Sequence, residues 1–151
     1  MTHSPSLLQR AVGWLRPTLF TNATFSGLAA ILAIDFASAL GPWLGAEPAL
    51  LRSLGVELGL FALAVGFVAW RLTPERPWTR YAVLAIAVLD LLWVAASVAL
   101  LLAPTSPLTV AGTWVVALQA LAVLDFGLIQ LAGWRGLGAS NARLEVVPVA
   151  G

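Results

Sequence analysis

The sequence predicts an all-α, polytopic membrane protein built as a bundle of four transmembrane helices. Hydrophobic residues make up 60% of the 151 residues, charged residues only 10%, and the mean hydropathy is +0.94. Soluble domains average about 45–50% apolar and about 25% charged residues. The chain also contains four apolar runs, each longer than the roughly 20 residues that a helix needs to cross a bilayer. The prolines, which break helix interiors, fall outside these runs or at their edges.

The predicted organisation is an N-terminal segment, four spans and a C-terminal tail, at residues 1–16, 17–40, 50–72, 81–103, 108–134 and 135–151. Around the first boundary Leu8, Val12, Leu15 and Leu19 recur at helical spacing. This spacing predicts a short helix that lies in the inner interface, with a frayed tail as the alternative. The C-terminal tail is rich in small and polar residues and is predicted to be a short disordered extension.

Arginine placement predicts the orientation. All eight basic residues are Arg, and seven of them precede the first span, flank the connection between the second and third, or follow the fourth, whereas Arg52 lies on the other side. Because positively charged loops stay in the cytoplasm, both termini are predicted to be cytoplasmic. A cleaved signal peptide is the alternative for the first span, since Ala37 and Ala39 have the small-x-small spacing of a cleavage site. The length of the run and Asp35 within it argue against cleavage.

One carboxylate falls within each apolar run, at Asp35, Glu57, Asp90 and Asp125. A charged group costs several kcal/mol at bilayer depth, so each carboxylate needs a partner, a water-filled cavity or a proton. Asp35 and Glu57 lie toward the outer ends of adjacent spans. Asp90 and Asp125 both lie about 14 Å from the cytoplasmic end of their spans, at about 1.5 Å per residue. If these two meet, one holds a proton, either as a relay or as interhelical glue.

Helical spacing places Trp93 and Ser97 on the same face of the third span as Asp90. These three residues, together with Asp35, Glu57 and Asp125, form the candidate intramembrane polar site. Asn22 and Ser26 lie at i and i+4 on the first span, and their amide and hydroxyl groups are predicted to bond neighbouring groups as structural glue.

The fourth span has Gln119 and Gln130 on one face, where they are predicted to bond an adjacent helix or a second subunit. On the second span, Gly55 and Gly59 have GxxxG spacing and Gly66 lies one heptad further on. Small residues in this register let two helices approach closely, within the bundle or in a dimer.

The residue types exclude several chemistries. The chain has no Cys and one His, which rules out disulfides, thiolate metal sites and a Ser with a His base. It has no P-loop, HExxH motif, nucleophile elbow or basic stripe with interleaved aromatics. We therefore predict no cofactor, catalytic residue, metal site or nucleic-acid partner, although a hard cation between Asp90 and Asp125 is an alternative. The predicted partner is the lipid bilayer, with a homo-oligomer or a membrane partner protein as further options.

Three segments resemble those of small uncharacterised bacterial four-span membrane proteins: residues 22–26, 89–94 and 113–130, which begin Asn-Ala-Thr, Leu-Asp-Leu and Thr-Trp. The resemblance covers most of the chain and implies a bacterial inner membrane, but it transfers no role to any residue. The chain departs from the small multidrug transporters, because their first helix has an essential glutamate and this one has Asp35 near its outer end.

The favoured functional hypothesis is a non-enzymatic structural or accessory membrane component whose polar residues lock the helices together. One alternative is a small oligomeric proton-coupled transporter or channel, in which Asp90 and Asp125 hold the coupling proton beside Trp93. Another is a membrane enzyme that acts on a lipid or quinone. The sequence names no ligand, partner or oligomeric state.

Overall fold

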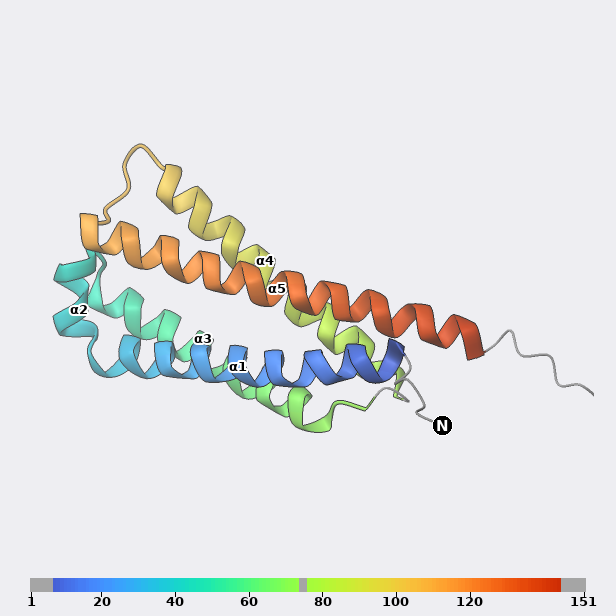
Figure 1. Cartoon of the computed structure of the whole chain (residues 1–151). Coiled ribbons are helices and arrows are strands. Elements are labelled where there is room, and N and C mark those ends of the chain that lie inside the picture. The colour runs from blue at the N-terminus through green and yellow to red at the C-terminus, as the bar shows by residue number, and fades with distance from the viewer. Residues whose placement is uncertain (1–6, 74–75, 145–151) are drawn as a thin grey trace, which may run out of the picture.

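The computed structural model describes residues 7–73 and 76–144, with side chains for residues 13–73 and 76–137. In these ranges the chain forms five helices and no strand: α1 (Leu7–Asp35), α2 (Ala37–Leu44), α3 (Pro48–Arg71), α4 (Pro77–Leu102) and α5 (Val110–Leu144). Four of them are long and apolar enough to cross a membrane, over Gly13–Asp35, Pro48–Arg71, Pro77–Leu102 and Val110–Leu137. The predicted all-α bundle of four membrane-spanning helices is therefore confirmed, and α2 is a short additional helix at one end (Figure 1).

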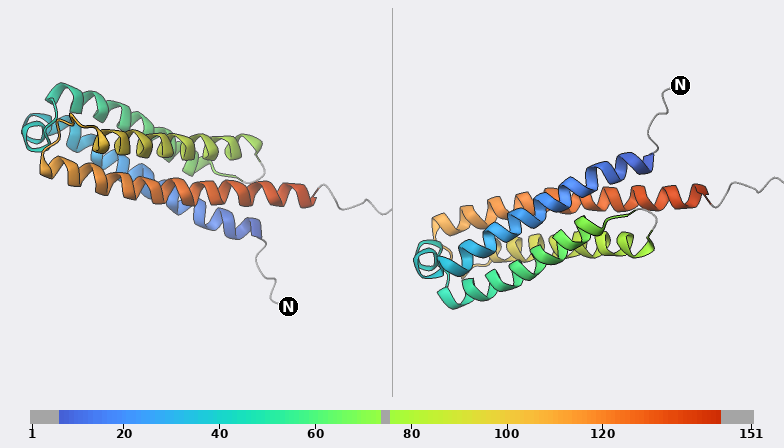
Figure 2. Two further views of the ribbon diagram at one scale, coloured as in Figure 1. Left: turned by 90° about the horizontal axis from the view of Figure 1, so that it is seen from above. Right: turned by 90° about the horizontal axis from the view of Figure 1, so that it is seen from below.

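The four long helices run side by side, and consecutive ones run in opposite directions (Figures 1 and 2). The start of α1 and the end of α5 lie at one end of the bundle, which we call the terminal end; α2 and the α4–α5 connection lie at the other, the α2 end. Helix α1 packs along α3 and α5, and α4 packs along α5. Of the neighbouring long helices, α3 and α4 contact each other least, so the bundle is more open on that side.

The first helix begins earlier and ends earlier than the predicted span. It runs unbroken from Leu7 through Pro17, so the expected interfacial helix is continuous with the first span. An interior proline costs about 3 kcal/mol because it removes a backbone hydrogen bond. Leu15 and Leu19, on either side of it, are both fully buried, and their packing offsets this cost. The helix ends at Asp35 rather than at residue 40, because Phe36 leaves helical geometry, with φ −107° and ψ 13°, before α2 begins.

The other boundaries follow simple local rules. Helices α3 and α4 begin with Pro48 and Pro77, where the fixed φ of proline suits a first turn and its missing N–H is not needed. Thr109 caps α5: its hydroxyl accepts from the Gly112 N–H at 3.0 Å and donates to the Trp43 carbonyl at 2.6 Å. This contact fastens α5 to the end of α2. Helix α5 continues to Leu144, so the predicted tail starts as helix, and residues 145–151 lie outside the described part.

The hydrophobic core lies toward the terminal end. Its buried residues come from all four long helices and are Leu15, Leu19, Val65, Val68, Ala69, Leu72, Val83, Ile86 and Leu137. Arg16 closes the core from outside: its Nε donates to the Ala69 carbonyl at 3.0 Å and its Nη2 to the Trp70 carbonyl at 2.9 Å. These carbonyls belong to the last turn of α3, where helical partners are missing and a positive charge is favourable.

The glycines of α3 face α1. A Cβ on Gly55 would lie 2.7 Å from Ile34 Cγ1 and 3.0 Å from the Ala30 carbonyl oxygen, so this position accommodates only glycine without a shift. Cβ atoms on Gly59 and Gly66 would lie 3.7 and 3.8 Å from alanine Cβ atoms of α1, which is ordinary contact. The glycine ridge of α3 therefore packs within the bundle.

Candidate functional site

Four polar side chains from three helices meet inside the bundle. They are Asn22 and Ser26 of α1, Asp90 of α4 and Gln130 of α5, all at most 3% exposed, and we call them the Asp90 cluster. Asn22 Nδ2 donates to Asp90 Oδ2 at 2.8 Å, and Gln130 Nε2 donates to the same oxygen at 3.0 Å. Ser26 Oγ donates to Asn22 Oδ1 at 3.3 Å. One carboxylate oxygen therefore joins α1, α4 and α5.

Local sequence positions these groups. Asn22 and Ser26 are four residues apart on α1 and so lie one turn from each other on the same face. Gly127 of α5 packs against α4 beside the carboxylate, where a Cβ would lie 3.5 Å from Asp90 Cβ, an ordinary contact distance. Amide donors at hydrocarbon depth have no water to bond, so a carboxylate that accepts from two of them stabilises both.

Asp125 is not part of the cluster. Its side chain is exposed on the outer surface of α5, and it makes no hydrogen bond or ion pair with the described residues. At about 100° per residue, Asp125 lies about 140° around the helix from Gln130, the residue of α5 that bonds Asp90. The depths of Asp90 and Asp125 agree with a pair, but the two side chains face different directions. The structure therefore does not bring them together, and Asn22 and Gln130 occupy the place expected for the second acid.

Asp35 and Glu57 are also exposed, and no hydrogen bond joins them in the described part of the chain. Asp35 is the last residue of α1. Glu57 lies on the side of α3 away from the glycine ridge and lines a cavity in the bundle. Arg52 donates to the Ser38 hydroxyl at 2.9 Å rather than to either carboxylate. Of the candidate acids, only Asp90 and Glu57 line this cavity.

The cavity, which we call the inner chamber, has a volume of about 210 Å³ and is lined by all four long helices. Its polar lining residues are Ser26, Glu57, Asp90 and Gln119. Its aromatic lining residues are Phe25, Phe61 and Trp93. The inner chamber is thus a mainly apolar space with two carboxylate side chains in its wall.

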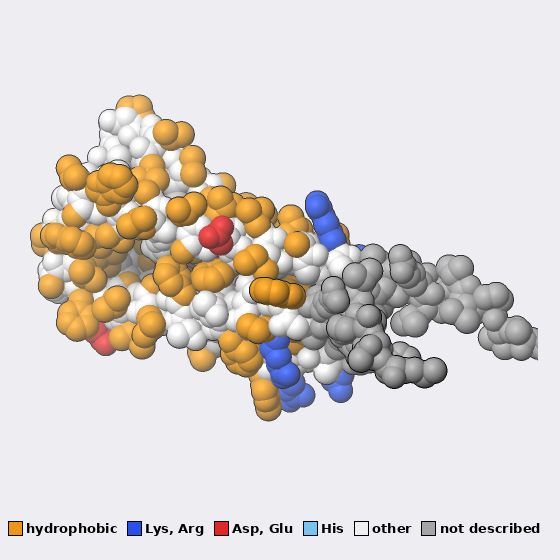
Figure 3. Space-filling view, in the orientation of Figure 1, with side chains coloured by type: hydrophobic (Ala, Val, Ile, Leu, Met, Phe, Trp, Pro, Cys, Tyr) orange, Lys and Arg blue, Asp and Glu red, His pale blue; other side chains and the backbone are white. Residues whose placement is uncertain are grey.

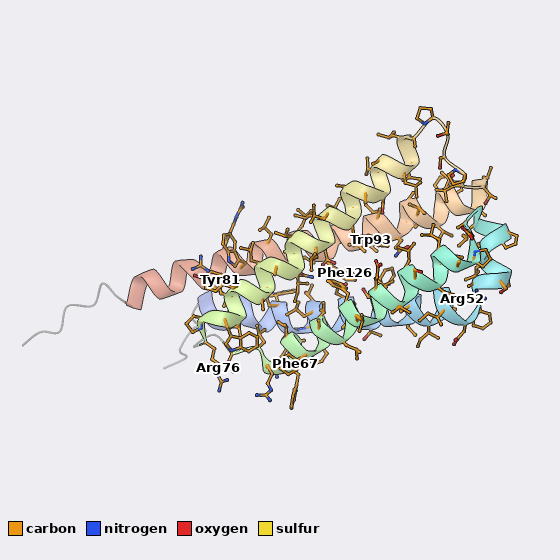
Figure 4. All side chains as sticks on the ribbon, turned by 180° about the vertical axis from the view of Figure 1, so that it is seen from behind. Arg52, Phe67, Arg76, Tyr81, Trp93 and Phe126 are labelled. Atoms are coloured by element: carbon orange, nitrogen blue, oxygen red, sulfur yellow. The ribbon has the colours of Figure 1, made fainter. Side chains whose placement is uncertain are left out.

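A second cavity, the outer chamber, has a volume of about 530 Å³ and extends from the inner chamber toward the α2 end. It lies between α3, α4 and α5, and most of its lining residues are apolar. Trp93 and Gln119 line both chambers and so stand at their junction; Figure 4 shows Trp93 part-way along α4. Ser97 lines the outer chamber, but its hydroxyl donates to the Trp93 carbonyl at 2.9 Å within its own helix.

The groups in the two chambers suit binding by charge, hydrogen bonds and aromatic contact. The described residues contain no group of three His, Cys, Asp or Glu side chains able to hold a metal ion. The sequence predicts Asp90 and Trp93 as site residues from their positions within the third span. It predicts Gln119 only as one of two glutamines on the same face of the fourth span. Comparison with protein-family models, with curated proteins and with solved structures finds no match for this chain.

Proposed function

We propose that this multi-pass membrane protein is a non-enzymatic structural or accessory component of a bacterial inner membrane, and that the Asp90 cluster holds its helices in one arrangement. The observation that carries the proposal is the convergence of Asn22 Nδ2 and Gln130 Nε2 on a single oxygen of Asp90. Because lipid offers no replacement partner, the cluster favours one register of α1, α4 and α5 over slipped alternatives.

In this proposal both termini lie in the cytoplasm. Five of the arginines with described side chains belong to the terminal end: Arg16, Arg71, Arg76, Arg80 and Arg135. The basic side chains visible on one face gather there (Figure 3), and Arg76 and Arg52 lie at opposite ends of the bundle (Figure 4). Loops rich in Arg stay on the cytoplasmic side, which supports this orientation.

The transporter alternative, as the sequence suggested it, needs Asp90 and Asp125 to exchange a proton. Because the Asp125 side chain is exposed on the outside of α5, a proton cannot pass directly between the two carboxylates. A lipid-facing carboxylate at this position is instead available to a membrane partner or a second copy of the chain, which fits an accessory component.

The test compares two substitutions of Asp90 in purified protein in lipid. Asp90→Asn keeps an oxygen that accepts both amide N–H groups, so we expect the protein to accumulate and unfold like the wild type. Asp90→Leu removes the acceptor, so we expect a marked loss of stability. If Asp90→Leu unfolds like the wild type, the hydrogen bonds of Asp90 do not hold the helices together, and the structural role is wrong.

A further inference from the structure

We propose that the inner and outer chambers form one intramembrane binding site for a compact apolar organic cation, with Glu57 and Asp90 as its anionic wall and Trp93 as an aromatic wall. This site goes beyond the structural role of the Asp90 cluster. It shares Asp90 with that cluster and is tested at Glu57 and Trp93, which lie outside it.

Charge complementarity identifies the sign of the ligand. Glu57 and Asp90 line the inner chamber, Glu47 lines the outer chamber, and no Lys, Arg or His of the described residues lines either chamber. Asp90 accepts two amide hydrogen bonds, but Glu57 makes no hydrogen bond or ion pair with the described part of the chain. A carboxylate in contact with hydrocarbon is costly unless a positive charge or a proton compensates it. A bound cation would supply that compensation.

The rest of the lining points to an organic cation. Phe25, Phe61 and Trp93 surround the inner chamber, and aromatic faces attract cations that carry little water. The lining of the outer chamber is mostly apolar, and its polar side chains are Glu47, Ser97 and Gln119. A strongly hydrated inorganic ion needs about six or more oxygen ligands, so these few groups would not replace the water that it loses. A quaternary ammonium ion with an apolar substituent fits both parts of the site.

The arrangement of the helices provides a route of entry. The outer chamber continues from Trp93 and Gln119 to the α2 end, and its walls include both α3 and α4. These two helices contact each other least, so the site is reached most easily between them. Trp93 stands where the wide apolar chamber meets the smaller acidic one, so its ring contacts a ligand on either side.

Glu57 offers a clean test, because the opposite side of α3 makes the packing contacts. Gly55 and Gly59 fit against α1, whereas the Glu57 side chain is exposed and makes no polar contact with the described residues. Glu57→Gln therefore removes one negative charge from the chamber wall and leaves the helix contacts unchanged. Asp125→Asn is the matched control, since it removes one negative charge from an exposed side chain outside both chambers.

The experiment is a calorimetric titration of the protein in nanodiscs of zwitterionic lipid. The probe is benzyltrimethylammonium, and its uncharged carbon isostere neopentylbenzene is the control ligand. We expect one probe ion per chain, an affinity about tenfold lower for Glu57→Gln, and an unchanged affinity for Asp125→Asn. A tenfold change corresponds to about 1.4 kcal/mol. Trp93→Leu should lower the affinity about fivefold through loss of the cation–π contact.

Three results would overturn the proposal. The first is the absence of saturable heat when the wild type is titrated with benzyltrimethylammonium. The second is an equal loss of affinity in Glu57→Gln and Asp125→Asn. The third is binding of neopentylbenzene as tight as that of the cation. The melting temperature of each variant, measured in the same nanodiscs, shows whether a lost signal comes from unfolding. Because the two carboxylate variants alter exposed side chains, a melting temperature equal to that of the wild type is expected for both.

Discussion

Replacement of Asp90 by Leu removes the one acceptor that three helices share. Asn22 and Gln130, both 0% exposed, would each keep a buried amide donor without its partner. An unsatisfied buried donor costs about 1–3 kcal/mol, and measured interhelical hydrogen bonds in membranes contribute about 0.6 and at most about 1.7 kcal/mol each. Two such losses give about 2–6 kcal/mol by the first figure and about 1–3 kcal/mol by the second, so we expect a destabilisation of about 2–3 kcal/mol, where the two ranges overlap.

The assay is reversible unfolding in mixed micelles, followed by the loss of helical circular dichroism as the denaturing detergent is increased. Asp90→Asn is the matched control, because its amide oxygen accepts both N–H groups while the charge is removed. We expect this variant to lie within about 1 kcal/mol of the wild type, since both hydrogen bonds remain.

The reasoning also predicts a rescue. In the triple variant with Leu at positions 22, 90 and 130, both amide donors and their shared acceptor are removed. Only the Ser26 hydroxyl loses its acceptor, and its bond to Asn22 Oδ1 is the longest of the three at 3.3 Å. Replacing a whole buried polar group by apolar side chains is often nearly neutral, so the triple variant should be more stable than Asp90→Leu alone. The reasoning is refuted if Asp90→Leu unfolds with the wild-type free energy, or if the triple variant loses at least the sum of the three single losses.

Three further changes test the packing of α1. Gly55→Ala should cost about 1–3 kcal/mol because its Cβ meets the α1 backbone, whereas Gly59→Ala should be nearly neutral; equal effects would contradict the ridge geometry. In a chain without native Cys, Ala23→Cys with Gly66→Cys should form a disulfide within one monomer, seen on non-reducing gels, because their Cβ atoms lie 3.8 Å apart; a dimer band alone would place the ridge between chains. Arg16→Met should cost about 1–2 kcal/mol in the unfolding assay through two lost hydrogen bonds to α3, and no loss would show that water replaces them.

The hydropathy of the sequence predicted the spans well, because membrane thickness imposes a length that apolar runs must meet. It predicted the facing of side chains less well. In a soluble bundle only the inward side of a helix is apolar, so the spacing of apolar residues shows which side faces the core. In a membrane the side that faces lipid is apolar too, so this spacing no longer distinguishes the two sides. Asp90 and Asp125 were therefore matched by depth alone, whereas their directions around α4 and α5 differ.

The predicted bounds of the spans hid the true partners of Asp90. Asn22 lies five residues from the predicted start of the first span and Gln130 four residues from the predicted end of the fourth, against nine for Asp90, whereas α1 begins earlier and α5 ends later than predicted. From the sequence alone, an uncharged amide such as that of Asn22 indicates hydrogen bonding between helices in general, and it does not identify a particular acid as the partner. No sequence pattern indicates the chambers, because they arise where α3 and α4 make few contacts.

The two carboxylates of the inner chamber contribute differently to the stability of the bundle. Asp90 is 2% exposed and accepts two hydrogen bonds, so its position is fixed by the fold. Glu57 is exposed and lies opposite the ridge that holds α3 to α1, so its charge can change without cost to packing. Helix α3 thus presents glycine to its neighbour and an acid to the chamber. The charge of the chamber wall can therefore change at Glu57 while the Asp90 cluster and the glycine ridge keep the helices in register.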